Sequence, residues 1–437
     1  MLRTGGGTGA LHGHAGRLVS SDLRREHQLQ IELSLHAGRA YPIDVIERNA
    51  SAVLRELARR YPVLTVTGPR QSGKTTLCRA LFTDRPYVNL EPLDTRDLVR
   101  RDPRGFLAAH RDGVLLDEIQ NVPELLSYVQ ADVDEDDRPG RFILTGSQHF
   151  GLSAAIAQSL AGRTAVFELL PPALDELRRF PGAPTDLMTT LWKGAYPRIF
   201  DQDIEPSRWL SDYTTTYIQR DVRQIANVTD LERFTTFLRL CAGRSGQELN
   251  VNALGADAGV SQPTARAWLS VLETGFLCHQ LPAWRRNVRK QTIKAPKLHF
   301  LDSGLMCFLL GIRSPDQLVT HPLRGAVFET WVASEMYKAR ANCGLPGALS
   351  HYRETRGPEV DVVVETGRTL ILVEAKSGAT VAADFFDGLD ALGTLLAPVE
   401  RGRVLRKVLV YGGDRQDRIG GTQIVPWSDV PSVDWLD

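Results

Sequence analysis

Long hydrophobic runs are absent from this chain of 437 residues. No stretch approaches the roughly 18 consecutive apolar residues that a membrane-spanning helix needs, so we expect no membrane span. The opening segment, MLRTGGGTGALHGHAGR, also lacks the continuous apolar core of a secretory signal peptide. Together these absences predict a cytoplasmic protein that does not contact a membrane.

Cysteine and lysine are scarce, and neither sign of charge is in excess. The five cysteines are scattered and no two have CxxC spacing, which argues against a disulfide framework or a zinc site. Only eight residues are Lys against 44 Arg, which we interpret as a GC-rich prokaryotic coding bias. Basic and acidic residues number 52 each, so any contact with nucleic acid must come from a local patch.

The composition, 43% hydrophobic and 24% charged, is that of a globular chain, and the length indicates several domains. Residues 1–40 are rich in Gly, His and polar groups and are predicted to be a flexible extension. Three folded units are expected after it, at 41–185, 186–297 and 298–437.

The first folded unit alternates short apolar segments with helical ones. The expected strands are 61–68, 87–90, 113–119, 141–147 and 165–170. This alternation predicts an α/β fold with a parallel sheet and crossover helices. An acidic run at 132–137 is expected to be a solvated loop, and the chain after residue 172 reads as mostly helical to about residue 280. A second mixed segment of a helix and strands starts near residue 325.

A glycine-rich segment between the first strand and the next helix fits GxxxxGK[ST]. Its glycines allow backbone N–H groups to turn inward around phosphates, and the helix N-terminus adds its positive end. Lys74 is expected to reach the β- and γ-phosphates and Thr75 to supply a hydroxyl to Mg²⁺; an ordinary glycine-rich loop is the alternative. The nucleotide-binding residues expected from the motif are Gly68, Pro69, Arg70, Gln71, Ser72, Gly73, Lys74, Thr75 and Thr76.

Further polar residues follow later strands of this sheet. Asp117 is expected to hold Mg²⁺ and Glu118 to orient and deprotonate the attacking water, unless the two form a solvated acidic turn. Ser147, or Gln148 beside it, could sense the γ-phosphate or simply cap a helix. Arg163, before the last strand, is a candidate finger acting on a neighbouring subunit, with a surface arginine as the alternative.

The order of these motifs resembles that of a known family. GPRQSGKTTL, LLDEIQNVPELL, ILTGSQ and SLAGR resemble the prokaryotic AAA+-type (AAA_14) ATPases that carry a C-terminal DUF4143 domain. YIQRDV, LHFLDSGLMCFLLG, VFETWVASE, EVDVVV and VEAKSG resemble that C-terminal partner. The resemblance implies a P-loop NTPase core that uses ATP, a helical and winged-helix-like middle, and a C-terminal mixed α/β domain of the restriction-endonuclease type. ATP over GTP rests on the resemblance alone.

The segment 253–273 reads as helix-turn-helix. Gln262, Thr264 and Arg266 would face outward at the start of the second helix, where major-groove contacts are made, although such helix pairs also bind proteins. A basic segment follows at 282–297 around Trp284 and is expected to form a wing that grips phosphates, or only a solvated charge run. Its basic residues are Arg285, Arg286, Arg289, Lys290, Lys294 and Lys297.

Near the C-terminus, Asp361 is followed after thirteen residues by Glu374-Ala375-Lys376. This form resembles the PD-(D/E)xK nuclease core, in which Asp361 and Glu374 would share Mg²⁺ and Lys376 would act on the attacking water. Glu329, on the preceding helix, would complete the acidic set. The alternatives are surface ion pairs, or a domain of this fold that no longer cleaves.

Two hypotheses of function follow. The first is a Mg²⁺-dependent ATPase that acts on DNA through the middle region and a nuclease-like C-terminal domain. The second is a regulatory ATPase switch, bound to DNA or to protein, whose C-terminal domain is catalytically inactive. A homo-oligomer and a protein partner are compatible with both.

Overall fold

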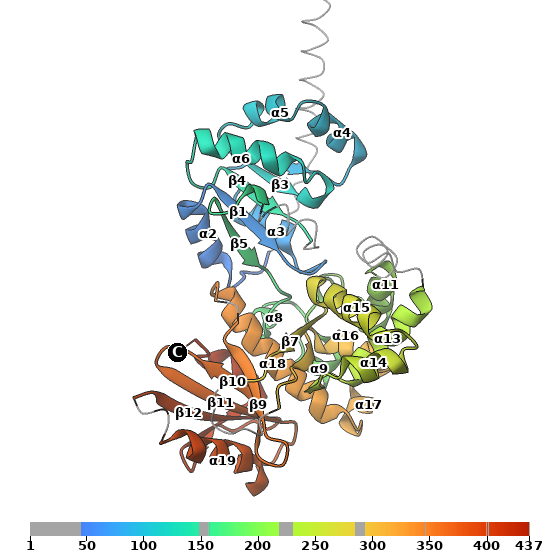
Figure 1. The fold of residues 1–437 in the computed structure, drawn as a ribbon, viewed down its shortest axis with the longest axis vertical. Coiled ribbons are helices and arrows are strands. Elements are labelled where there is room, and N and C mark those ends of the chain that lie inside the picture. The colour runs from blue at the N-terminus through green and yellow to red at the C-terminus, as the bar shows by residue number, and fades with distance from the viewer. Residues whose placement is uncertain are drawn as a thin grey trace, which may run out of the picture.

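The computed structural model describes residues 45–147, 156, 158–217, 230–284, 293–345, 347–398, 400 and 402–436 (Figure 1). The expected N-terminal extension and Gln148 lie outside these residues. Four residues of the expected basic wing also lie outside them, namely Arg285, Arg286, Arg289 and Lys290. Within the described part of the chain, no helix has the length and apolar character needed to cross a membrane.

The first unit is a five-stranded parallel sheet in the order β2-β3-β4-β1-β5. The strands are β1 Val63–Thr67, β2 Tyr87–Asn89, β3 Val114–Asp117, β4 Phe142–Thr145 and β5 Thr164–Glu168. Each lies within a segment that the apolar pattern predicted, apart from Thr164 at the start of β5. β1, β3 and β4 are buried along their whole length because helices cover both faces of the sheet.

The helices of this unit are α2 Ser51–Arg60, α3 Lys74–Leu81, α4 Leu93–Arg101, α5 Pro103–Ala109 and α6 Leu125–Glu135. α2 and α3 pack on one face of the sheet, and α5 and α6 on the other (Figure 1). α4 and α5 are separate helices, because Pro103 starts a new helix that Asp102 caps by accepting from the Gly105 N–H at 2.9 Å.

The acidic run at 132–137 is mostly helical, so the expectation of a loop is wrong there. α6 continues to Glu135. Its carboxylates are compensated by arginines, since Asp132 pairs with Arg141 and Asp134 with Arg163. The repulsion expected from five neighbouring carboxylates is therefore balanced by contacts distant in the sequence.

The middle unit is helical with one small sheet. Its helices are α8 Leu174–Leu177, α9 Leu187–Lys193, α10 Pro197–Asp201, α11 Pro206–Tyr217, α13 Leu231–Gly243, α14 Val251–Asp257, α15 Gln262–Thr274, α16 Ser303–Leu309 and α17 Pro315–Val319. β6 Gln247–Glu248, β7 Cys278–Leu281 and β8 Lys297–Phe300 form a three-stranded sheet in the order β6-β8-β7. β8 begins at residue 297, where the sequence suggested a boundary, and pairs with strands that precede it.

The C-terminal unit is a mixed six-stranded sheet in the order β13-β14-β12-β11-β10-β9. The strands are β9 Leu349–Arg353, β10 Glu359–Glu365, β11 Thr369–Lys376, β12 Val404–Tyr411, β13 Asp417–Ile419 and β14 Thr422–Pro426. β11 runs parallel to β12 and antiparallel to β10. α19 Asp387–Leu396 covers one face and α18 Arg324–Asn342 the other. The sequence did not predict β13 and β14, which are short.

α18 lies at the centre of the molecule (Figure 1). It contacts β5 of the first unit, α9, α16 and β8 of the middle unit, and β11 of the C-terminal sheet. Because it has partners in all three units, α18 buries thirteen of its nineteen residues, charged ones such as Glu335 and Lys338 included.

An ion pair within α18 also binds backbone groups of the segment that leads from the first unit into the middle unit. Glu335 accepts from the Leu174 backbone N–H at 2.7 Å and pairs with Lys338 at 2.8 Å. Lys338 also donates to the Pro172 carbonyl oxygen at 3.1 Å. Arg48 joins the same region to the glycine-rich loop, since its guanidinium donates to Glu176 and to the Ser72 carbonyl, each at 3.0 Å.

Candidate functional site

The glycine-rich loop at 68–75 connects β1 to α3 with a backbone that requires glycine at two positions. Gly68 has φ +145°, and a side chain there would meet the Leu169 carbonyl oxygen at 2.2 Å. Gly73 has φ +92° and immediately precedes α3. These conformations are open to glycine and strained for other residues. The loop therefore folds as the motif predicts, around the N-terminus of a helix.

Lys74 is the buried cation of this loop. Its side chain is 7% exposed, and its ammonium donates to the carbonyl oxygens of Gly68 at 3.0 Å and Pro69 at 2.7 Å. Burial lowers the pKa of Lys74 to about 8, because the carboxylates of Glu118 and Asp117 offset only part of the cost of desolvation. A buried ammonium held mainly by carbonyl dipoles is well suited to bind an anion.

Asp117, at the end of β3, is held by three hydroxyl groups. Thr75 Oγ1 donates to its two oxygens at 2.9 and 3.1 Å, and Tyr87 Oη donates at 2.9 Å. Thr145 Oγ1 donates to Asp117 as well. Sequence reasoning named Thr75 but missed Tyr87 and Thr145. Thr145 could have been found from its position at the end of β4, because parallel strands place the residues at their carboxyl ends on one edge of the sheet. Tyr87 begins β2 and had no such signal.

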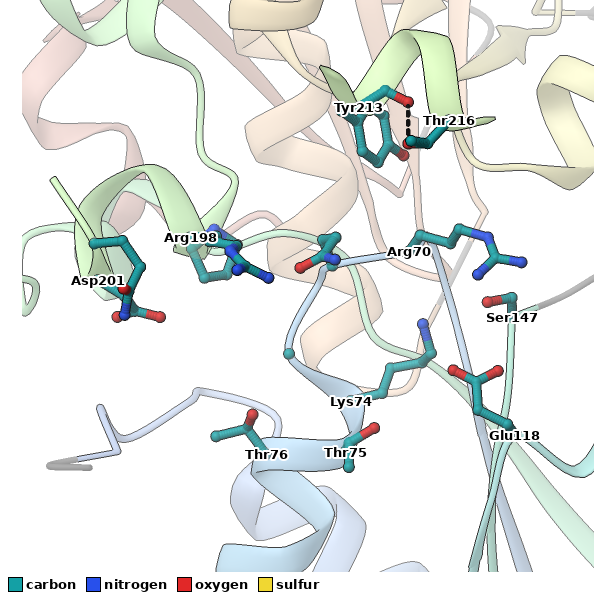
Figure 2. Close-up of a pocket in the computed structure, with 14 residues that line it drawn as sticks. Arg70, Lys74, Thr75, Thr76, Glu118, Ser147, Arg198, Asp201, Tyr213 and Thr216 are labelled. Atoms are coloured by element: carbon teal, nitrogen blue, oxygen red, sulfur yellow. Dashed lines mark hydrogen bonds between the residues drawn. The ribbon is translucent and has the colours of Figure 1, made fainter. Parts of the chain in front are cut away.

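A cavity of about 710 Å³ opens over the loop. Figure 2 shows Lys74 and Glu118 on one side of it, close to Ser147 and Arg70. Arg198 and Asp201 reach the cavity from α10, and Tyr213 and Thr216 from α11 (Figure 2). Of the expected nucleotide-binding residues, those that line it are Arg70, Gln71, Gly73, Lys74, Thr75 and Thr76. Gly68, Pro69 and Ser72 belong to the loop without lining the cavity.

Arg198 is a cationic residue of this cavity that sequence reasoning missed. It is exposed and sits on a five-residue helix more than a hundred residues after the loop. No motif marks it, and only the packing of the middle unit against the first unit brings it to the cavity.

Arg163 lies elsewhere. It precedes β5, at the opposite edge of the sheet from the loop, and its Nη2 pairs with Asp134 Oδ2 at 3.0 Å. It does not line the cavity of its own chain. A role at the nucleotide of a neighbouring subunit stays a prediction.

The expected helix-turn-helix consists of α14 and α15. Ser261 caps α15 by accepting from the Thr264 N–H at 3.3 Å. Arg266 is exposed, whereas Gln262 and Thr264 are half-buried. Trp268 and Leu272, on the inner face of the helix, are buried in the core.

Two residues of the expected basic wing lie in the protein interior. Trp284 is 3% exposed, packs in the core of the C-terminal sheet and donates its indole N–H to Glu365 at 2.8 Å. Lys297 is 1% exposed and contacts carboxylates of the C-terminal unit. Neither can contact phosphates, so the interpretation of these two as exposed wing residues is wrong. Lys294 is exposed.

The C-terminal candidates do come together. Glu329 of α18, Asp361 of β10, and Glu374 and Lys376 of β11 line one pocket beside Glu359, which the sequence analysis did not name. Glu374 and Lys376 share a face of their strand and pair at 2.6 Å, as strand alternation predicts. Burial and the neighbouring Asp361 carboxylate raise the pKa of both Glu329 and Glu374.

Three family models match successive parts of the chain. Residues 60–178 match an AAA domain, residues 184–316 match a domain of unknown function, DUF8612, and residues 324–430 match a domain of unknown function, DUF4143. The expectation of an AAA-type core followed by a DUF4143 domain is confirmed. The sequence analysis did not anticipate the family of the middle unit.

Whole-chain similarities point to relatives of undescribed function. An uncharacterised protein of Mycobacterium tuberculosis and one of Mycobacterium bovis are each 29% identical over 338 residues, which cover 76% of this chain and 74% of the relative. A Walker-type ATPase of Pyrococcus abyssi is 16% identical with a TM-score of 0.39, over 61% of this chain and 96% of that one. The parallel sheet, the loop at 68–75 and the AAA match together identify the first unit as a P-loop NTPase-like core.

Proposed function

We propose that the first unit binds ATP together with Mg²⁺ and hydrolyses it. The observation that carries this proposal is the position of Lys74, a buried ammonium at a helix N-terminus that opens onto a cavity of nucleotide size. The match of residues 60–178 to an AAA domain supports the same function.

The oxygens beside Lys74 suit a magnesium ion. Thr75 Oγ1 and the Asp117 carboxylate lie 2.9 Å apart at the carboxyl edge of the sheet. Mg²⁺ prefers one or two protein oxygens of this kind, with waters and substrate phosphates as its other ligands. Thr75 and Asp117 would hold it, and the ion would neutralise charge on the phosphates. Glu118 would then orient the attacking water, while Ser147 and Arg198 would contact the γ-phosphate.

Phosphate release by the purified full-length protein tests the proposal. Lys74→Ala is expected to lower turnover at least a hundredfold and to abolish nucleotide binding, because it removes the phosphate-contacting cation. Glu118→Gln is expected to retain binding and to lower turnover about 10²–10⁴-fold, as for loss of a general base. The control is Glu124→Gln, which changes an exposed carboxylate that follows Glu118 in the sequence. The proposal would be contradicted if the wild-type protein showed no turnover, or if Lys74→Ala left the turnover unchanged.

We also propose that the middle unit contacts DNA. The order of α13, β6, α14, α15, β7 and β8 is that of a winged helix, with α15 in the position of the recognition helix. Arg266 is exposed near the start of α15, and Lys294 is exposed where the chain returns to β8. The formal net charge of zero means that such contacts would be local.

The C-terminal unit supports a restriction-endonuclease-like fold. The unit begins with a helix, α18, and three antiparallel strands, β9, β10 and β11. A second helix, α19, then leads to β12, which runs parallel to β11. Acidic residues lie on β10 and β11. Whether such a domain cleaves depends on the carboxylate pocket, and one residue in that pocket favours the regulatory switch over the nuclease.

A further inference from the structure

Lys297 lies inside the carboxylate pocket of the C-terminal unit. Its ammonium is 2.8 Å from Glu329 Oε1, 2.7 Å from Glu359 Oε1 and 3.3 Å from Asp361 Oδ1. With 1% of its side chain exposed, it is among the most deeply buried charged residues of the described chain. Three carboxylates from two elements thus converge on one ammonium.

The middle unit supplies this lysine. Lys297 is the first residue of β8, where it pairs with Leu281 of β7 and with Glu248 of β6. The middle unit also approaches the carboxylates at Gly246, where a side chain would lie 3.3 Å from Glu329 Oε2. The pocket is therefore completed by a residue from outside the C-terminal sheet.

The charge of Lys297 is maintained by its neighbours. Burial alone would lower its pKa, but Asp361, Glu329 and Glu359 outweigh burial and raise it. Two further cations compensate the rest of the pocket, since Arg353 pairs with Glu359 at 3.1 Å and Lys376 with Glu374 at 2.6 Å. Glu329, Glu359, Asp361 and Glu374 thus each have a cationic partner, and Asp387, which also lines the pocket, is exposed.

A divalent ion does not fit this arrangement. Mg²⁺ requires oxygens about 2.0–2.1 Å away in octahedral geometry. Asp361 Oδ1 faces the Lys297 ammonium, and Oδ2 accepts from the Ala375 backbone N–H at 3.0 Å. Across the part of the chain that the structure describes, no group of three or more His, Cys, Asp or Glu residues is arranged to hold a metal ion. Glu374 Oε2 is buried and has no hydrogen-bond partner among the described residues.

We propose that the Lys297 ammonium is the resident cation of this pocket, bound to the Asp361 carboxylate that the nuclease hypothesis assigns to Mg²⁺, so that the pocket is a metal-independent ion cluster joining the middle and C-terminal units. This proposal does not depend on the proposed ATPase activity. It favours a switch that binds and signals without cleaving, because cleavage by such a pocket would require the metal.

Binding of Mn²⁺ to the nucleotide-free, full-length protein tests it. The wild-type protein and Glu374→Gln are expected to bind Mn²⁺ identically in an electron paramagnetic resonance titration, because Glu374 is part of no metal site. Any weak binding of Mn²⁺ at Asp117 is expected to be the same in both proteins. A saturable Mn²⁺ site in the wild type that Glu374→Gln removes would overturn the proposal.

Lys297→Met provides the complementary test, since it leaves Glu329, Glu359 and Asp361 without their shared cation. We expect it to lower the melting temperature by several degrees, and Mn²⁺ to restore part of that loss by binding at least tenfold more tightly than to the wild type. Lys294→Met, in the same segment but exposed, should change neither quantity. A Lys297→Met protein as stable as the wild type in EDTA would contradict the proposal. If Lys297→Met does not fold, the wild type and Glu374→Gln still decide the question.

Discussion

Two buried lysines distinguish the two pockets of this protein. Lys74 and Lys297 are exposed by 7% and 1%, so desolvation disfavours the charge of both. Lys74 donates to two carbonyl oxygens and its pKa falls to about 8, whereas Lys297 contacts three carboxylates and its pKa rises. The difference teaches that burial of a cation does not by itself mark a binding site. What matters is whether the protein already supplies the compensating anions.

The largest effect that we expect on stability concerns a third buried lysine, Lys338, which has one carboxylate partner. Lys338→Met should lower the free energy of unfolding by about 3–5 kcal/mol, because it leaves Glu335 charged and buried. The double variant Glu335→Gln/Lys338→Met should recover most of that loss. Urea unfolding measures both, with Lys407→Met, from a partly exposed pair, as the control. A single variant as stable as the control would show that the pair does not stabilise the packing of α18 against Pro172 and Leu174.

A smaller effect of opposite sign is expected at Lys74. The folded-state pKa of about 8 lies below the unfolded value of 10.5, so folding disfavours the ammonium at pH 7. Lys74→Met should therefore raise the free energy of unfolding of the nucleotide-free protein by about 1–3 kcal/mol. The gain should disappear as the pH rises past 10.5, where the unfolded lysine is also neutral. If the Lys74→Met protein were less stable than the wild type at pH 7, the buried ammonium of Lys74 would stabilise the fold, and its contrast with the ammonium of Lys297 would be lost.

A histidine on β7, whose ring nitrogens are buried, allows the cost of burying a charge to be tested outside the two pockets. Burial lowers the pKa of His279 on β7 to about 4, and its ring stacks on Tyr337 with centroids 5.1 Å apart. Because the unfolded histidine binds a proton below about pH 6.5, stability should fall as the pH drops from 6.5 towards 4, by roughly 1–3 kcal/mol. His279→Phe should flatten that decline while keeping the stacked ring. Chemical unfolding at several pH values measures the difference, and parallel curves for the two proteins would refute the prediction.

The smallest effect is expected at an exposed cation. Arg266→Ala should weaken binding to duplex DNA only a few-fold and lower the slope of log affinity against log salt by about 1, because one phosphate contact is lost. Arg208→Ala, an exposed arginine on α11, is the matched control. Salt-dependent binding that is identical in all three proteins would favour a protein partner for α15.

Local patterns predicted most of the first unit correctly. β1, β3 and β4 are short apolar segments that end where a glycine or a charged residue follows, and such segments are recognisable without tertiary information. The same holds for the loop around Lys74, whose chemistry depends on consecutive residues. The strand-end residues Asp117 and Ser147 were named for the same reason.

Long-range contacts explain what the sequence analysis missed. Arg198 and Tyr87 carry no motif, and packing alone brings Arg198 to the cavity over the loop and Tyr87 to Asp117. The run at 282–297 looked like a single exposed wing because its residues are consecutive and mostly basic. Its two described ends are instead buried, with Trp284 in the core of one unit and Lys297 in the carboxylate pocket.

The sequence alone thus determined a P-loop core, the place of Lys74 in its loop and an acidic set near the C-terminus, because each is encoded by neighbouring residues or by strand periodicity. Only the tertiary structure decided what the acidic set contacts. β8 brings Lys297 to carboxylates that lie 32 to 64 residues further along the chain. Whether a carboxylate cluster attracts a metal or is already neutralised depends on such distant charges, and spacing in a sequence does not record them.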